Sequence, residues 1–275
     1  MGIFSGCLLV SDIDGTLLHD NIIPQSNFDA IEYFKSEGGL FTVASGRGPS
    51  VGKQIAKDLK VNAPVLFSNG SIIYDVWENK VIHADYLSDE CKALVKKVIK
   101  KFPEIGAEVN LIDKIITVND NATTRWHREY DGFKYIPYTP DEAKDFEWVK
   151  TLFMTKDQEL LSRVKEYMAG IKPRSAEYIV TSPIFYEVHV GGVNKALNLP
   201  KLLSMLGVKS ENLYTIGDYY NDIELVKAGK IGAFTCEAPE DIKPFASFIS
   251  CSVECGAVAD FINYLTTKRK GEVNG

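Results

Sequence analysis

Short, continuous apolar runs alternate with amphipathic segments in the N-terminal part of the chain. Runs without interspersed polar residues are typical of strands covered on both faces, and such runs lie at 7–10, 40–44 and 65–67. The segment 25–39 has apolar residues at helical spacing. In the following segment Val51, Ile55 and Leu59 repeat every fourth residue and predict one buried helix face. This order predicts a parallel sheet in which 65–67 is the third strand.

The same alternation returns in the C-terminal part of the chain. Its pattern predicts strands at 212–218, 231–236 and 248–253 and short helices at 221–229 and 239–246. A last helix follows, with one apolar face formed by Val258, Phe261, Ile262 and Leu265. Pro200 interrupts the helical spacing of 195–207, so this segment either kinks or begins its helix late.

The middle of the chain has a different order of predicted helices and strands. A charged helix and a second helix are predicted at 88–102 and 158–168, and strand-like runs lie at 114–120, 149–155, 177–181 and 185–190. We therefore expect an α/β protein with a Rossmann-like parallel-sheet core at 1–82 and 189–275. An α+β module, 83–188, is inserted into that core.

The composition and charge of the chain argue against some classes of binding partner. The 275 residues are 45% hydrophobic and 25% charged, as in an ordinary globular protein. A net charge of −6 without a long basic block argues against a nucleic-acid partner. No apolar stretch approaches the roughly 18 residues of a membrane span, and no leader pattern begins the chain, so we expect a cytoplasmic protein without a membrane partner. The sequence has no long apolar stripe that would indicate a protein–protein interface, so it does not predict an oligomeric state.

The cysteines are Cys7, Cys91, Cys236, Cys251 and Cys255. They form neither a CxxC pair nor an even set, which favours reduced thiols and argues against structural zinc.

Polar clusters follow the predicted core strands. They lie at 11–16, at 45–47, at 68–70 and at Asp218. Because the carboxyl ends of parallel strands share one edge of a sheet, where ligands bind, we expect the four clusters to converge on one crevice.

The acidic residues of this crevice predict a metal. Asp12, Asp14, Asp218 and Asp222 would place up to four carboxylates in a small volume, where like charges repel unless a proton or a cation intervenes. Carboxylate oxygens without His or Cys favour Mg²⁺.

Counterparts for an anion are present as well. Lys195, Ser45 and Arg47 carry suitable donors, and Gly15 lets the turn before Thr16 expose its backbone amides. The predicted ligand is a phosphate ester on Mg²⁺. A carboxylate held by the metal can attack phosphorus in line, which predicts an aspartyl-phosphate intermediate.

Each motif alone also has a structural explanation. DG and SNG are common turns, SGR can lead into a helix, and most lysines are solvated surface residues. Asp14 can stabilise a turn, and Asp218 or Asp222 can cap a helix. The occurrence of all of these motifs at the same edge, in one order, favours a functional site.

The motifs SDIDGTLL, ASGR, GGVNKAL with Lys195, and GDYYND resemble the four motifs of the haloacid dehalogenase superfamily of phosphohydrolases. The closest resemblance is to its Cof-type branch (subfamily IIB), which has a large α/β cap of type C2B. The match covers the whole chain in order. Ala196 follows the lysine where the branch often has glycine.

The resemblance implies roles for the acidic residues. Asp12 would be the nucleophile, and Asp14 would be the acid that protonates the leaving alcohol and the base that activates water. Mg²⁺ would be bound by Asp12, the backbone carbonyl of Asp14 and Asp218, with Asn221 and Asp222 in support.

Further residues would bind the substrate. Ser45 and Lys195 would contact the transferring phosphoryl group. The substrate-binding residues would be Gly15, Thr16, Gly46, Arg47, Asn69 and Gly70. The cap would select the substrate, and its stretch 123–133, rich in cations and aromatics, either faces the leaving group or is ordinary cap surface. His189, beside the hinge, is expected to be structural.

The sequence thus predicts a phosphoric monoester hydrolase, an Mg²⁺-dependent phosphatase of small phosphorylated metabolites such as sugar phosphates or a phosphorylated cofactor. One alternative is a phosphotransferase or phosphomutase of the same superfamily. Another is a non-catalytic phospho-signalling module; such receiver domains have about half this length and lack a cap, and the acid–base role of Asp14 argues against it.

Overall fold

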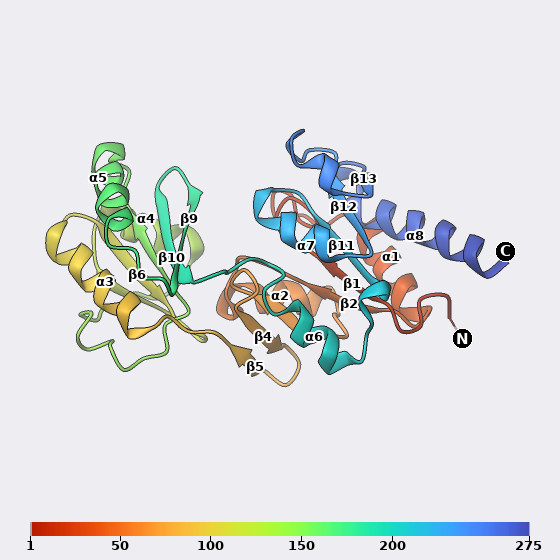
Figure 1. Cartoon of the computed structure of the whole chain (residues 1–275), viewed down its shortest axis with the longest axis horizontal. Helices are drawn as coiled ribbons and strands as arrows, with labels where there is room; N and C mark the ends of the chain where they lie inside the picture. Colours follow the sequence, from red (N-terminus) through yellow and green to blue (C-terminus); the bar gives the residue numbers. More distant parts are fainter. Residues whose placement is uncertain (1, 275) are drawn as a thin grey trace. The chain divides into compact units, whose positions relative to one another are not determined.

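The computed structural model describes residues 2–274, and their contacts divide the chain into two compact units (Figure 1). The core unit comprises the chain up to His83 together with the chain from Asn194 onward. The cap unit comprises Ala84–Val193. Each unit has a sheet and a hydrophobic core of its own, so each is described separately.

A five-stranded, fully parallel sheet organises the core unit. Its order is β13-β12-β11-β1-β2. The strands are β1 (Leu8–Ser11), β2 (Leu40–Val43), β11 (Leu213–Gly217), β12 (Ile231–Thr235) and β13 (Phe248–Ser250). Leu8 pairs with Leu213 on one side and with Leu40 on the other, which places β1 between β11 and β2. The predicted fold class is confirmed.

Helices pack against this sheet. They are α1 (Gln25–Ser36), α2 (Pro49–Asp58), α6 (Leu199–Leu206), α7 (Ile223–Ala228) and α8 (Ala257–Asn274). Leu8 and Val10 pack in one cluster with Leu202 of α6 and Leu225 of α7. The predicted apolar face of α8 is buried, and α8 packs against α1. The helix containing Pro200 begins late, with the proline in its first turn, where a missing N–H costs little.

The third predicted strand does not belong to the parallel sheet. β3 (Val65–Phe67) forms an antiparallel sheet with β4 (Ile72–Asp75) and β5 (Lys80–Ala84), and only one bridge, from Ala44 to Leu66, connects it to the end of β2. The strand itself is confirmed and its bridge to Ala44 is parallel, but its ladder is with β4 across a hairpin in which Ser68, Asn69 and Gly70 have φ angles of 50°, 54° and 82°. Three successive left-handed residues turn the chain back into a hairpin.

The buried face of α2 differs from the predicted one. Gly52 and Ala56 are buried, whereas Val51 is 38% exposed. A Cβ atom at Gly52 would lie 2.5 Å from the ring of Phe67. The helix therefore approaches its neighbours through small residues, and of the predicted face Leu59 is buried whereas Val51 is not.

The C-terminal elements are shorter than predicted. The segment predicted as helix 239–246 forms only the 3-10 turn η3 (Lys243–Phe245). The strand predicted at 248–253 ends at Ser250, because the Asp260 carboxylate accepts the Cys251 N–H at 2.9 Å. The remaining 3-10 turns are η1 (Ser210–Asn212), η2 (Tyr220–Asp222) and η4 (Val253–Cys255).

The cap unit is a five-stranded antiparallel sheet with helices. Its order is β7-β6-β8-β10-β9. The elements are α3 (Asp89–Lys101), β6 (Gly106–Asn110), β7 (Ile115–Asn119), α4 (Ala122–Asp131), β8 (Lys150–Met154), α5 (Gln158–Ala169), β9 (Ala176–Ser182) and β10 (Phe185–Val190). Leu94 and Leu161 pack with Phe153 and Val188 in its core. Sequence patterns did not predict β6 or α4.

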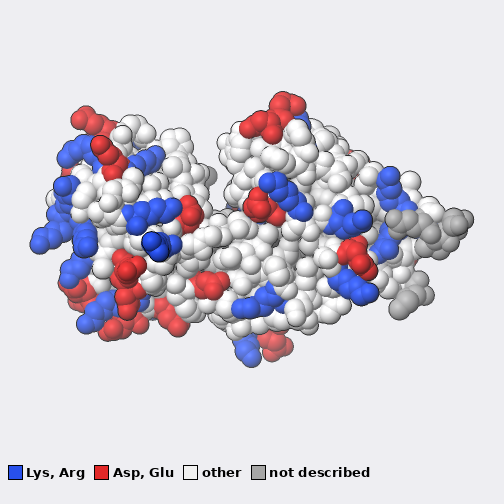
Figure 2. Space-filling view, in the orientation of Figure 1, with Lys and Arg blue, Asp and Glu red and all other residues white. Residues whose placement is uncertain are grey.

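The surface of the cap unit is charged. Over this unit, Figure 2 shows lysine and arginine side chains with aspartate and glutamate among them. Among residues 2–274, no helix combines the length and the apolar character needed to cross a membrane.

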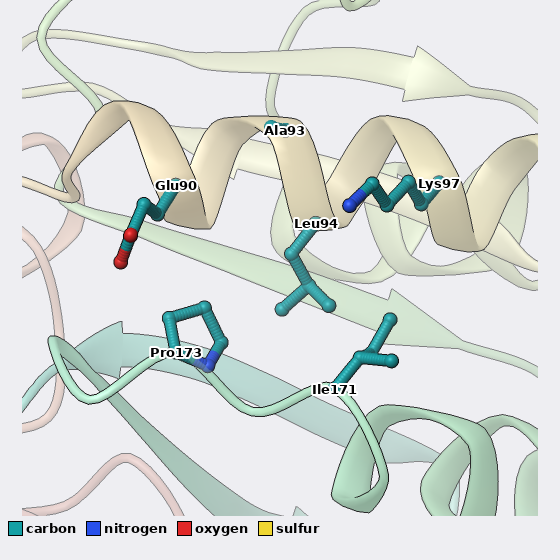
Figure 3. A pocket seen from close by; sticks show the side chains of 6 residues that line it. All are labelled: Glu90, Ala93, Leu94, Lys97, Ile171 and Pro173. Carbon is teal, nitrogen blue, oxygen red and sulfur yellow. The ribbon is translucent and has the colours of Figure 1, made fainter.

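A hollow of about 260 Å³ lies on the cap unit between α3 and the segment that follows α5. Figure 3 shows Leu94 pointing toward Ile171 and Pro173. Glu90, Ala93 and Lys97 complete its lining. Its titratable groups are a single carboxylate and a single ammonium group, so the lining does not indicate a catalytic site.

Candidate active site

Three carboxylates meet at the carboxyl edge of the core sheet. Asp12 directly follows β1 and Asp218 directly follows β11, and the Asp12 N–H donates to the Ile216 carbonyl at 2.9 Å. Asp222 lies at the end of η2. One oxygen from each of the three aspartates lies within 4.8 Å of the others. Parallel pairing of β1 with β11 thus brings together residues that are far apart in sequence.

The backbone after β11 fixes Asp222. Its buried carboxylate accepts the N–H groups of Asp218 at 3.1 Å and Tyr219 at 3.2 Å. Gly217 leaves room for it, because a Cβ atom there would lie 2.4 Å from the Asp222 Cβ. The spacing of the GDYYND motif therefore fixes the orientation of the Asp222 side chain relative to Asp218.

Lys195 enters this acidic group. Its Nζ lies 2.5 Å from Asp12 Oδ1 and 2.7 Å from Asp222 Oδ1, and its side chain is only 4% exposed. A Cβ atom at Gly70 (φ 82°) would lie 2.5 Å from the Asn194 carbonyl oxygen. Gly70 therefore allows the close approach of the chain that carries Lys195. The alternative that Lys195 is a solvated surface lysine is wrong.

The three carboxylates of this group outnumber its single ammonium group, so negative charge is in excess. Burial raises the pKa of Asp12 well above its usual range, and Asp222 and Asp218 add to that effect while Lys195 offsets part of it. Burial and Asp222 raise the pKa of Asp218 to about 6. Although burial opposes its charge, Asp12 and Asp222 raise the pKa of Lys195. Three carboxylates beside one ammonium group, with all-oxygen donors, fit a divalent cation.

Asp14 lies apart from the three carboxylates. Its carboxylate accepts from Arg47 Nε at 2.9 Å and from another guanidinium nitrogen at 2.6 Å, and its side chain is 51% exposed. The expected cluster of four carboxylates therefore contains three. The two parallel donors of a guanidinium group bind a carboxylate well, whereas a position among three further carboxylates would repel it.

The loops after β2 and β3 are joined around Ser45. The Ser45 side chain is buried, its Oγ accepts the Arg47 N–H at 3.1 Å, and its carbonyl accepts the Asn69 N–H at 3.0 Å. Gly46 leaves space for Asn69, because a Cβ atom there would lie 3.2 Å from Asn69 Oδ1. Among the described residues, neither Asn69 Oδ1 nor the Ser68 hydroxyl has a hydrogen-bond partner. SNG is thus a hairpin turn that also brings buried polar atoms beside Ser45.

The turn after β1 closes tightly. The Ile13 carbonyl accepts from the backbone N–H groups of Leu17 and Leu18 at 2.9 and 2.8 Å. Thr16 is thereby brought back to the acidic group, where its Oγ1 lies 3.3 Å from both an Asp12 and an Asp218 oxygen. The Thr16 hydroxyl therefore contacts carboxylates. Asn221, expected to support a metal, lies exposed in η2.

The stretch 123–133 of the cap forms most of α4. His127 Nδ1 lies 2.8 Å from a Glu108 oxygen, and Arg128 lies 3.0 Å from Asp120. The rings of Trp126 and Tyr130 are stacked, and both are exposed. The buried cation and imidazole of this stretch are thus engaged within the cap unit, and its aromatic residues are accessible.

Sequence analysis missed a buried ionic network in the cap unit. Lys150 Nζ lies 3.0 Å from Glu187, which also contacts His189 Nε2 at 2.5 Å. Although burial alone would raise it, Lys150 and His189 hold the pKa of Glu187 below its usual range. Charged residues within otherwise apolar strand segments were the available signal. His189 is buried and hydrogen-bonded, in keeping with a structural role.

The core unit has a parallel sheet with a buried aspartate group at its carboxyl edge, and an α+β unit is inserted into its sequence. The chain belongs to the haloacid dehalogenase-like hydrolase family, whose model matches residues 9–262. The family and the enzyme class predicted from the four motifs are confirmed.

Relatives cover nearly the whole chain. It is 28% identical over 248 residues to the 5-amino-6-(5-phospho-D-ribitylamino)uracil phosphatase YcsE of Bacillus subtilis, covering 88% of this chain and 89% of the relative. The phosphatase YitU of the same organism, named for the same substrate, is 21% identical, and the match covers 93% of this chain and 96% of the relative.

Solved structures share the fold. A haloacid dehalogenase-like hydrolase from Bacteroides thetaiotaomicron superposes with a TM-score of 0.84 at 22% identity, covering 94% of this chain and 99% of that one. A sugar phosphatase of subclass IIB superposes with a TM-score of 0.79 at 20% identity, with the same coverage.

Proposed function

We propose that the chain is an Mg²⁺-dependent phosphatase that hydrolyses small phosphorylated metabolites through an aspartyl-phosphate on Asp12. The observation that carries this proposal is the buried Asp12 carboxylate, which lies among Asp218, Asp222 and Lys195. Membership of the hydrolase family and the phosphatase names of the relatives support the same reaction class.

The proposed metal site uses the acidic group. Asp12, Asp218 and the backbone carbonyl of Asp14 would hold Mg²⁺, with Asn221 and Asp222 in support. When bound, the ion would neutralise charge on the acidic group and on the phosphoryl oxygens. Lys195 holds the Asp12 carboxylate in place, and with Ser45 it provides donors for phosphoryl oxygens.

The first half-reaction transfers the phosphoryl group to Asp12. A carboxylate oxygen of Asp12 forms a bond to phosphorus as the ester P–O bond breaks, and Asp14 gives its proton to the departing oxygen. In the second half-reaction Asp14 removes a proton from water, whose oxygen attacks phosphorus and releases Asp12. Phosphate and the free alcohol are the products.

The ion pair between Asp14 and Arg47 describes the site before substrate binds. The guanidinium group of Arg47 donates to both carboxylate oxygens of Asp14, so neither oxygen faces a substrate in this state. A phosphate ester is an equally good partner for the same two donors. We infer that substrate binding draws Arg47 to the ester and releases Asp14, which takes up a proton from solvent before it donates that proton to the leaving oxygen.

The substrate class is proposed from the relatives. Two of them are named for a phosphorylated ribityl compound, and one fold neighbour is a sugar phosphatase. A phosphorylated sugar or polyol metabolite is therefore proposed, with 5-amino-6-(5-phospho-D-ribitylamino)uracil as the first compound to test.

A panel of phosphorylated metabolites tests the function. The purified protein, supplied with Mg²⁺, is expected to release inorganic phosphate from one or a few sugar or polyol phosphates, and Asp12→Asn protein prepared in parallel should not. An isomerised phosphosugar or a phosphorylated acceptor without free phosphate would establish a phosphotransferase instead. A stable phosphoprotein without turnover would establish a signalling module.

Replacing Asp14 by asparagine is expected to slow turnover by about 10²–10⁴-fold, because the proton donor and the base are lost together. The loss should be greater for an alkyl phosphate than for p-nitrophenyl phosphate, whose leaving group needs no proton. Steady-state rates on both substrates measure this difference. Equal losses on the two substrates would contradict the acid role of Asp14.

Replacing Gly15 by alanine should reduce turnover by at least roughly 10-fold, because displaced catalytic groups lose rate steeply. Gly15 has φ +85°, and a Cβ atom there would lie 2.3 Å from the Asp218 carboxylate. Gly6 is the matched control, since its φ is +76° and no atom lies within 4 Å of the corresponding Cβ position. If Gly6→Ala loses as much activity as Gly15→Ala, backbone strain rather than contact with Asp218 explains the effect.

A further inference from the structure

Three of the five cysteines gather at one end of the core sheet. Cys236 directly follows β12 and Cys251 directly follows β13, and the last residues of these parallel strands, Thr235 and Ser250, are paired. Cys255 ends the turn η4, four residues after Cys251. All three thiols are free. The proposed phosphatase reaction uses none of them.

Cys251 and Cys255 are brought together by one backbone carbonyl. The Cys251 Sγ lies 3.6 Å from the Ser252 carbonyl oxygen, and the Cys255 N–H donates to that same oxygen at 3.0 Å. The Ser252 hydroxyl also accepts from the Cys255 N–H, at 3.3 Å. The turn therefore folds the backbone of Cys255 back onto the side of Ser252 where the Cys251 thiol lies.

The two thiols differ in accessibility. Cys255 is exposed, whereas Cys251 is partly buried, and its N–H is fixed by Asp260. Burial raises the pKa of Cys251, and the charges of Asp260 and of the Cys255 thiolate raise it further. The geometric support is the Ser252 carbonyl oxygen, which both the Cys251 thiol and the Cys255 N–H contact. An oxidant would thus reach Cys255 first, with Cys251 behind it.

We propose that Cys251 and Cys255 form a modification site that closes to a reversible disulfide when a peroxide oxidises it. The Cys255 thiolate attacks one peroxide oxygen, the O–O bond breaks, and a sulfenic acid and a hydroxide form. The Cys251 sulfur then displaces hydroxide from the sulfenic sulfur, and the S–S bond forms. The two thiol protons leave with the two hydroxides as water, and the peroxide is reduced by two electrons.

Peptide mapping of the full chain tests this site. The folded protein is treated with hydrogen peroxide, its remaining thiols are alkylated, and it is digested with a glutamate-specific protease without reduction. Cleavage after Glu237 and Glu254 places the three cysteines on three separate peptides. The expected product joins the Cys251 and Cys255 peptides at more than tenfold excess over any link to Cys236, and dithiothreitol removes it.

Two variants complete the test. Cys236→Ser should keep the linked peptide pair, and Cys255→Ser should lose it while retaining the circular dichroism spectrum of the parent. A bridge between Cys251 and Cys236 would overturn the proposal. Separate sulfinic acids on Cys251 and Cys255, or full alkylation of both thiols after exposure to excess peroxide, would also overturn it.

Discussion

Asp12→Asn is expected to reduce Mg²⁺-dependent phosphate release by at least about 10³-fold, because the amide cannot replace the carboxylate as nucleophile. The substitution preserves side-chain shape in a buried position, so the fold should be retained. Phosphate release from p-nitrophenyl phosphate, with circular dichroism alongside, measures both effects.

Asp20→Asn is the matched control for this experiment. Asp20 lies near the same loop, but its side chain is 87% exposed and its partner His19 is also largely accessible. Turnover should stay within about twofold of the parent, as expected for an exposed residue outside the site. Parent-like turnover in Asp12→Asn itself would remove the proposed nucleophile.

The metal-free protein is expected to lose stability as the pH rises from about 4 to about 6. Burial and Asp222 raise the pKa of Asp218 to about 6 from an ordinary value of 3.8. Between these values the folded state holds a proton that the unfolded state has released, so rising pH favours unfolding. The contribution of Asp218 is about 3 kcal/mol, present at low pH and lost above pH 6.

Thermal unfolding in EDTA between pH 4 and 8 measures this effect. At pH 7.5, Asp218→Asn should melt above the parent in EDTA, and its melting temperature should change less between pH 4 and 6. Added Mg²⁺ should raise the melting temperature of the parent and have little effect on the variant. A variant that melts below the parent in EDTA, or shows the same pH slope, would contradict the proposed repulsion among the three carboxylates.

The sequence predicted the convergence of the site because strand direction decides it. Asp12 and Asp218 each follow an apolar run, and parallel pairing of two such runs places their next residues side by side. Lys195 was identified only by its place in an ordered series of motifs, since nothing in its own neighbourhood distinguishes it. Its burial depends on the close approach at Gly70.

What the sequence did not predict depends on partners from other elements. The Asp14 carboxylate is positioned by its hydrogen bonds from Arg47, and Arg47 comes from the loop after a neighbouring strand. SNG indicated the hairpin turn at 68–70, since Asn and Gly tolerate left-handed backbone, but it did not indicate that the strand before the turn lies outside the five-stranded sheet. Lys150 and Glu187 lie on two adjacent strands of the cap sheet, and the charged residues within apolar strand segments signal a buried ionic contact without showing which residues pair.

The most direct test of whether Asp12 and Asp218 share one cation is anomalous diffraction from crystals soaked in Mn²⁺. This ion replaces Mg²⁺ and scatters anomalously. The account predicts a single strong peak at the edge of the core sheet, with carboxylate oxygens of both Asp12 and Asp218 at about 2.1 Å. A peak bound by only one of these residues, or a peak elsewhere with this edge empty, would contradict it.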